Sequence, residues 1–153
     1  CFGVGFELSL ACDFRLVTPT TLYALPEQKL GQIPGSGGSA RLQTMVGITR
    51  TNGIVMRSRR IPGPQAVAWG VATECVPDQE LEAATDALVD ELRGFSPLAQ
   101  RTAKKLLNDT EDSGLSVAIE LEGHCYSRLR SSDDFREGVE AFHDKRKPNF
   151  VGT

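Results

Sequence analysis

The hydrophobic pattern of the chain changes near residue 77, and this change is the strongest constraint on its fold. Before it, glycine and proline break the chain into short runs, and residues 13–18 alternate polar with apolar side chains, as half-buried strands do. After it, apolar residues recur every three or four positions, which predicts amphipathic helices. The first such run contains Leu81, Ala84, Leu88 and Leu92. Strands followed by helices argue against the regular βαβ alternation of a complete doubly wound sheet.

The composition is that of an ordinary globular domain. With 153 residues, 40% hydrophobic and 24% charged, the chain is long enough for one domain with a core. Its formal net charge of −3 predicts neither nucleic acid nor an acidic membrane as a partner. No apolar run reaches the ~18 residues of a membrane span. The basic clusters at 57–60 and 145–147 predict solvated faces or, alternatively, docking sites for ligand phosphates.

The cysteines show neither C-x-x-C pairing nor a histidine at metal-ligand spacing; they are Cys1, Cys12, Cys75 and Cys125. We therefore expect no metal site, and reduced, mostly buried thiols in a cytoplasmic protein. The chain does not open with the basic segment of a secretory signal. Because the first residue is not methionine and motifs begin at once, we expect a chain that is cut at its front.

Residues 3–11 are predicted to form a short buried helix whose start is rich in glycine. Gly3 and Gly5 permit a close approach of backbone there. The first N–H groups of a helix have no intrahelical partner, so the N–H of Val4 could stabilise negative charge on a carbonyl oxygen. Glu7 lies one helical turn further on the same side, where its carboxylate could reach a substrate whose carbonyl oxygen is bound by the N–H of Val4. Alternatively, Glu7 only complements the helix dipole.

A second carboxylate, Glu27, follows Pro26 on a turn-rich segment. Alone, it fits a surface residue as well as a catalytic one. Together with Glu7, it could hold one water molecule while one acid accepts a proton and the other donates one. Further along, Ser36 is predicted to cap a helix that ends at Gly47, and Ser96 and the 131–134 segment to cap later helices.

Several motifs resemble the enoyl-CoA hydratase/isomerase (crotonase) family. They are GVGFELSLACDFR, then ALPExxLGxIPGxGGxxRL, RIPGPQAVAWGVATECVP, SPLAQRTAKKLL and DFREGVEAFHDKRKPNF, and they cover essentially the whole chain. The resemblance implies an α/β fold, with a crotonase-like ββα spiral followed by a helical trimerisation region. Residues 1–76 would then be the C-terminal part of the spiral core with active-site segments, and residues 77–153 the oligomerisation region.

The resemblance also implies a reaction: a lyase of fatty acid metabolism that hydrates a 2-enoyl-CoA thioester to a 3-hydroxyacyl-CoA. Backbone N–H groups of the family stabilise a thioester enolate, and Val4 would supply one of them. Glu27 would exchange a proton at the α-carbon and Glu7 would activate water. Hydratases commonly carry glycine where this chain has Val4, whose side chain narrows the acyl pocket.

Further expectations follow from the same resemblance. Gly3 and Gly5 would bind substrate, and Phe142 and Lys145 fall where family members contact the adenine end of CoA. A packed phenylalanine and a solvated lysine are the alternative there. The second backbone donor would come from an upstream loop that this sequence does not contain, so residues 1–153 alone should lose most activity.

Cofactors, partners and rival functions complete the prediction. No cofactor is expected beyond the CoA of the substrate, and no partner beyond the acyl-CoA thioester and further copies in a homotrimer or a hexameric dimer of trimers. The alternatives are an acyl-CoA thioester hydrolase or enoyl-CoA isomerase of the same fold, or a non-catalytic assembly fragment.

Overall fold

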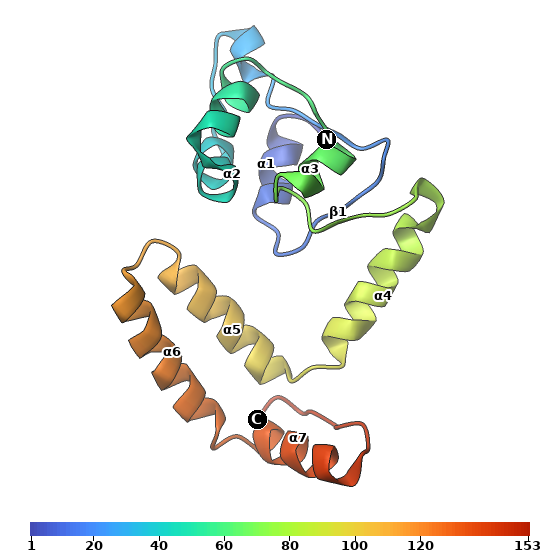
Figure 1. Cartoon of the computed structure of the whole chain (residues 1–153), viewed down its shortest axis with the longest axis vertical. Coiled ribbons are helices and arrows are strands. Elements are labelled where there is room, and N and C mark those ends of the chain that lie inside the picture. The colour runs from blue at the N-terminus through green and yellow to red at the C-terminus, as the bar shows by residue number, and fades with distance from the viewer. The chain divides into compact units, whose positions relative to one another are not determined.

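The computed structural model describes residues 1–153 and divides into two compact units, Cys1–Asp86 and Ala87–Thr153 (Figure 1). We call them the N-terminal unit and the C-terminal unit. The N-terminal unit holds every strand together with several helices, and the C-terminal unit is helical; their boundary falls within α4 (Leu81–Arg93). The predicted mixed α/β class, with helices in the majority, is confirmed. The functional division at residues 76 and 77 stays a prediction.

The strands of the N-terminal unit are short and pair over long sequence separations. β1 (Leu16–Val17) lies parallel to β4 (Glu74–Cys75), and β2 (Leu22–Tyr23) lies antiparallel to β3 (Ile61–Pro62). The predicted strand at 13–18 exists but is shorter than expected. Its end has a physical cause: the N–H of Thr18 donates to the hydroxyl of Thr21 at 2.9 Å, which turns the chain directly after β1.

The helices of the N-terminal unit include one that is broken by glycine. Its helical segments are α1 (Val4–Leu10), η1 (Glu27–Leu30), α2 (Gly38–Val55), α3 (Gly63–Ala68) and η2 (Asp78–Glu80). Within α2, Gly47 has φ 76° and ψ 165°, values that no helix contains. The prediction that a helix ends at Gly47 is therefore confirmed, and a second helical segment follows it.

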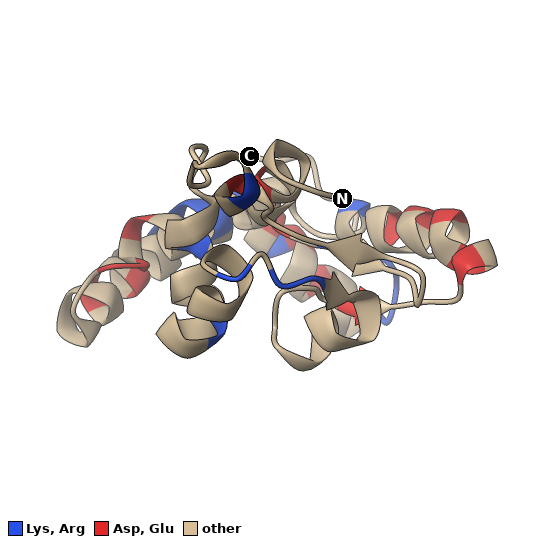
Figure 2. Cartoon of the chain, turned by 90° about the horizontal axis from the view of Figure 1, so that it is seen from above, with Lys and Arg blue, Asp and Glu red and all other residues tan.

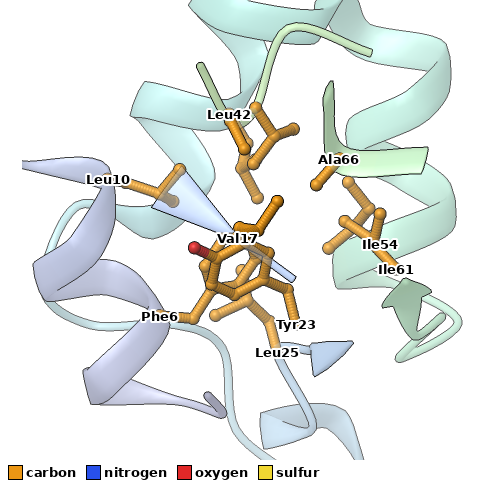
Figure 3. Packing of buried hydrophobic residues seen from close by; sticks show 11 residues of the cluster. Phe6, Leu10, Val17, Tyr23, Leu25, Leu42, Ile54, Ile61 and Ala66 are labelled. Atoms are coloured by element: carbon orange, nitrogen blue, oxygen red, sulfur yellow. The ribbon is translucent and has the colours of Figure 1, made fainter. Parts of the chain in front are cut away.

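The core of the N-terminal unit forms where α1, α2 and the strands meet (Figure 3). The rings of Phe6 from α1 and Tyr23 from β2 stack with their centroids 4.3 Å apart. Leu25, Leu42 and Ile54 are fully buried around them. This packing fixes α1 against the segment that follows β2, and both carry the glutamates singled out in the sequence.

The C-terminal unit contains the end of α4 together with α5 (Pro97–Thr110), α6 (Leu115–Leu129) and α7 (Asp133–Asp144), and α5 packs against α6. Two serines cap these helices as predicted. The hydroxyl of Ser96 accepts from the N–H of Ala99 at 3.1 Å, and that of Ser132 accepts from the N–H of Phe135 at 3.0 Å.

Asp134 fastens the C-terminal tail to the first turn of α7. It is 3% exposed and accepts hydrogen bonds from the hydroxyl of Ser96 and from the N–H groups of Val151 and Gly152. Burial acts to raise the pKa of Asp134, but these hydrogen bonds outweigh it and hold the pKa below its ordinary value. The charged carboxylate therefore joins α5, α7 and the tail.

Asp134→Asn is expected to lower the midpoint of thermal unfolding by about 5 °C or more, because an amide nitrogen cannot accept the bonds that the lost oxygen accepted. Far-ultraviolet circular dichroism measures the midpoint. The matched control is Asp133→Asn, which weakens an exposed pair with Arg136 and a long, exposed hydrogen bond from the hydroxyl of Thr153, and should shift the midpoint by about 2 °C or less. Equal shifts in the two variants would contradict the assigned role of Asp134.

Charged residues of both signs lie along the helices (Figure 2). The ion pairs between them are mostly exposed and local, such as Lys105 with Asp109 at 2.6 Å, and pairs of this kind contribute little to stability. None of the helices combines the length and the apolar composition that crossing a membrane requires.

Candidate active site

Glu7 is buried inside the N-terminal unit and held by backbone donors. It belongs to α1 and is 3% exposed. Its Oε1 accepts the N–H of Ser36 at 2.8 Å and the N–H of Gly38 at 2.9 Å. Gly38 is the first residue of α2, whose N–H groups lack intrahelical partners and lie at the positive end of the helix dipole. The carboxylate of Glu7 is thus fixed in one orientation.

This arrangement corrects the prediction that Ser36 caps the following helix. The residue that precedes α2 is Gly37, with φ 88°, and no side chain adjacent to it caps the helix. Instead, the acceptor comes from Glu7, far earlier in the chain, and Ser36 contributes its backbone N–H to the same oxygen. The local sequence suggested a serine cap because it cannot show a carboxylate that the tertiary fold supplies.

Gly38 touches Glu7 so closely that no side chain fits there. A Cβ atom on Gly38 would lie 2.7 Å from Cγ and 2.9 Å from Oε1 of Glu7. The glycine at 38 therefore leaves the room that the carboxylate of Glu7 occupies.

Glu27 begins η1, and its carboxylate reaches the start of α1. Its Oε1 lies 3.0 Å from the position that a Cβ on Gly3 would occupy. Backbone pairing brings the two together: Phe2 bridges Ala24, and the N–H of Gly3 donates to the carbonyl of Ala24 at 3.0 Å. Glu27 follows Ala24 by one short turn. Because Gly3 has φ 55° and ψ −130°, a conformation open mainly to glycine, this approach depends on glycine.

The second oxygen of Glu27 is buried without a partner. Oε2 is out of contact with solvent and accepts no hydrogen bond from the protein. A buried acceptor left unpaired costs about 1–3 kcal/mol, so it is seldom retained without a function. It is one of two buried side-chain oxygens of the chain without a partner, the other being the hydroxyl of Ser58, and it is free to pair with a proton of a bound molecule.

Val4 begins α1, three residues before Glu7. The N–H of Gly5 donates to the carbonyl of Phe2, and the N–H of Glu7 donates to that of Gly3. No protein group accepts a hydrogen bond from the N–H of Val4, the first residue of α1, and its side chain is 68% exposed. The carboxylate of Glu27 thus lies against Gly3, and the carbonyl of Gly3 accepts the backbone N–H of Glu7. The free N–H of Val4 follows Gly3 directly in the chain.

The remaining predicted site residues differ in their surroundings. Gly5 is an ordinary helical residue, and a Cβ there would lie 3.6 Å from the sulfur of Cys1, a normal contact. Phe142 and Lys145 belong to the C-terminal unit, at the end of α7, where both are exposed. Gly3 and Val4 lie at the start of α1 with the carboxylate of Glu27 against Gly3, whereas the carboxylate of Glu7 is held at the start of α2. Catalytic roles for Val4, Glu7 and Glu27 and binding roles for Gly3, Gly5, Phe142 and Lys145 stay predictions.

The C-terminal unit contains a cavity of about 590 Å³ that sequence reasoning missed. Its apolar lining includes Tyr126, Phe135, Val139, Phe142 and Phe150. The helical spacing of these residues was visible in the sequence, but their convergence with Phe150 of the tail depends on the fold of that tail. The expected burial of the cysteines is wrong: Cys1 and Cys12 are exposed, and Cys75 and Cys125 are half-buried, although all are free thiols.

Known proteins resemble this chain over essentially its whole length. The family model for enoyl-CoA hydratase/isomerase matches residues 1–153. Mitochondrial methylglutaconyl-CoA hydratase of Mus musculus is 34% identical over 98% of this chain and 49% of its own length. Carnitinyl-CoA dehydratase of Salmonella arizonae is 37% identical over 99% of this chain and 59% of its own length.

Solved structures agree with the sequence comparison. The crystal structure of an enoyl-CoA hydratase from Bacillus anthracis superposes with a TM-score of 0.97 at 32% identity, over 100% of this chain and 59% of that one. The chain therefore spans about half to three fifths of the length of the relatives that it matches.

Proposed function

The chain belongs to the enoyl-CoA hydratase/isomerase family, and from this premise we propose that its protein adds water to a 2-enoyl-CoA thioester, giving a 3-hydroxyacyl-CoA. The predicted crotonase-like fold is confirmed by the Bacillus anthracis structure. The observation that carries the proposed reaction is that two glutamates are held differently: Glu7 of α1 is fixed by two N–H groups, and Glu27, whose carboxylate reaches the start of α1, has a buried, unpaired oxygen.

In the proposed mechanism, the thioester carbonyl oxygen accepts the free N–H of Val4. This contact strengthens as negative charge gathers on that oxygen in the enolate, and loss of one such donor typically costs about 2.7–4 kcal/mol of barrier. The exposed side chain of Val4 leaves its backbone N–H in place while limiting the room for the acyl group.

The two carboxylates divide the proton transfers between them. Glu7 starts ionised and accepts a proton from water as the water oxygen bonds to the β-carbon. Glu27 starts protonated and gives its proton from the unpaired Oε2 to the α-carbon, and the proton on Glu7 returns to Glu27 through water before the next turnover. The sum adds one water molecule across the double bond. Because Oε1 of Glu7 is engaged by Ser36 and Gly38, its other oxygen is the one left to hold the water. Proton transfer of this kind contributes typically 10²–10⁴-fold in rate.

Three-fold assembly is part of the proposal. Large apolar side chains on α6 are exposed in the single chain; among them, Leu115 is 77% and Ile119 61% exposed. Patches of this kind mark protein interfaces. We propose that this helix contributes to contacts in a homotrimer or a dimer of trimers. A cytoplasmic location also stays a prediction, since some relatives carry mitochondrial names.

The test of the proposed reaction uses the full-length protein that carries this chain. Incubated with crotonyl-CoA, it should remove the absorbance of the conjugated enoyl thioester without releasing a free thiol. Release of free CoA would indicate a hydrolase instead, and a shift of the double bond without hydration would indicate an isomerase. No turnover of any enoyl-CoA by the intact protein would favour an assembly role.

A further inference from the structure

Residues 28–73 form a basic stretch in a chain that is acidic as a whole. The stretch contains no aspartate or glutamate, although the formal net charge of the chain is −3. Its cations are Lys29, Arg41, Arg50, Arg57, Arg59 and Arg60. Because the stretch spans α2, β3 and α3, all of this positive charge belongs to the N-terminal unit.

Two of these arginines lie over the same indole ring. The guanidinium carbon of Arg50, in α2, is 5.3 Å from the ring centroid of Trp69, and that of Arg59 is 5.1 Å from it. Trp69 directly follows α3 and is half-buried. Contact with a ring orients a planar guanidinium group and leaves its N–H groups free to bind an anion. The indole thus gathers two like charges at one place.

The backbone holds Arg59 in a constrained turn. Its N–H donates to the carbonyl of Gly53 at 3.2 Å, which ties the turn to the end of α2. The preceding residue, Ser58, has φ 49°, a left-handed conformation that is costly for a residue with a side chain. Such strain persists only where the surrounding structure fixes it, and it is found most often at functional sites.

The arginines around Trp69 have no counter-charge in the protein. Arg50, Arg57 and Arg59 are exposed, and none of them belongs to an ion pair. Nη2 of Arg59 donates only a long hydrogen bond, of 3.4 Å, to the neutral amide oxygen of Gln65. Cations gathered in this way repel one another, and a bound anion would remove the repulsion.

We propose that Arg50 and Arg59, positioned by Trp69, bind a polyvalent phosphate group, such as a free polyphosphate or the headgroup of a phosphoinositide carries. The fork of N–H donors on a guanidinium group matches the oxygens of a phosphate. Because Arg57 and Arg60 add unpaired cations on the same turn, a group with several negative charges fits better than one with a single charge.

The proposed phosphate site is separate from the candidate active site. Arg50 follows Gly38, the residue against Glu7, by about three helical turns, and it lies beyond the interruption of α2 at Gly47. The inference therefore does not rest on the proposed hydration. Arg59→Gln should hydrate crotonyl-CoA at the rate of the parent while losing affinity for phosphate.

Titration of the full-length protein with sodium tripolyphosphate tests the site. Calorimetry should show binding that weakens as sodium chloride is added. The affinity should fall about tenfold or more in Arg50→Gln and in Arg59→Gln, because each change removes charge-assisted hydrogen bonds. The matched control is Arg128→Gln, which removes an exposed arginine of α6 and should leave the affinity unchanged. Unchanged affinity in both α2-side variants would overturn the inference.

The indole provides a second measurement at the site itself. Trp69 is the only tryptophan in the chain, so its fluorescence reports on the two guanidinium groups over its ring. Tripolyphosphate should change the emission of the parent, and this change should be missing in Trp69→Phe. If sodium chloride at the same ionic strength changed the emission equally, the effect would be screening of repulsion and the site would be refuted.

Vesicles and coenzyme A identify the source of the phosphate. Sedimentation with phosphatidylcholine vesicles that contain phosphatidylinositol bisphosphate, reversed by tripolyphosphate, would assign a lipid headgroup to the site. Binding of tripolyphosphate without sedimentation would assign a free polyphosphate. Equal sedimentation with phosphatidylserine vesicles of the same charge would contradict a phosphate site. So would displacement of tripolyphosphate by coenzyme A, which would assign these arginines to the proposed substrate.

Discussion

Replacing Glu27 by glutamine is expected to lower kcat for hydration of crotonyl-CoA by about 10²–10⁴-fold, the usual contribution of a proton-transferring side chain. Glutamine preserves the shape of the residue beside Gly3 but can neither give a proton to the α-carbon nor take one from it. Because the buried Oε2 of Glu27 has no partner in the protein, the variant should fold as the parent does. Loss of enoyl absorbance measures the rate, and thermal unfolding checks the fold.

Glu7→Gln should reduce kcat to a similar extent, but with an added structural effect. Its Oε1 receives N–H donors from Ser36 and Gly38, and a neutral amide oxygen accepts them less strongly than a carboxylate. The control for both changes is Glu80→Gln, at an exposed position of the same unit. Rates within about fivefold of the parent in both variants would remove the two glutamates from the mechanism.

Gly38→Ala is expected to lower kcat by about 10²-fold although it leaves both carboxylates in the chain. The added methyl group would lie 2.7 Å from Cγ of Glu7, closer than carbon atoms can approach, and must push the carboxylate out of position. Displacements of about 1 Å in a catalytic group have effects of this size. The measurement is again hydration of crotonyl-CoA by the full-length protein.

The matched control for this variant is Gly35→Ala. A methyl group there would meet no atom within 4 Å, so the rate should stay near that of the parent. If Gly38→Ala were as active as Gly35→Ala, the orientation of Glu7 would not limit the reaction. Loss of activity in both would point to a general requirement for a flexible loop.

Features that depend on neighbouring residues were predictable from the sequence. The helix over 3–11 corresponds to α1, Gly47 interrupts α2, and Ser96 and Ser132 cap α5 and α7. Each of these rests on side chains within a few positions, where spacing and capping chemistry operate. The family motifs then identified the fold that contains them.

Features that depend on distant residues could not be predicted in the same way. The acceptor at the start of α2 is Glu7 rather than Ser36, and nothing local signals it. The approach of Glu27 to Gly3 needs the bridge between Phe2 and Ala24. Likewise, the partner of Arg146 is Glu137, across a turn whose left-handed lysine no propensity would suggest.

Glu7 accepts two backbone N–H groups at the start of α2, so its loss would affect the structure more than the loss of Glu27 would. In a descendant without the proposed hydration activity, Glu27 could be exchanged at little cost in stability, since no protein group donates a hydrogen bond to its buried Oε2. Such a descendant would still keep an acid at Glu7, because the entrance of α2 would otherwise fray. Persistence of Glu7 is therefore poor evidence that chemistry has been retained, and the identity of residue 27 is the better marker.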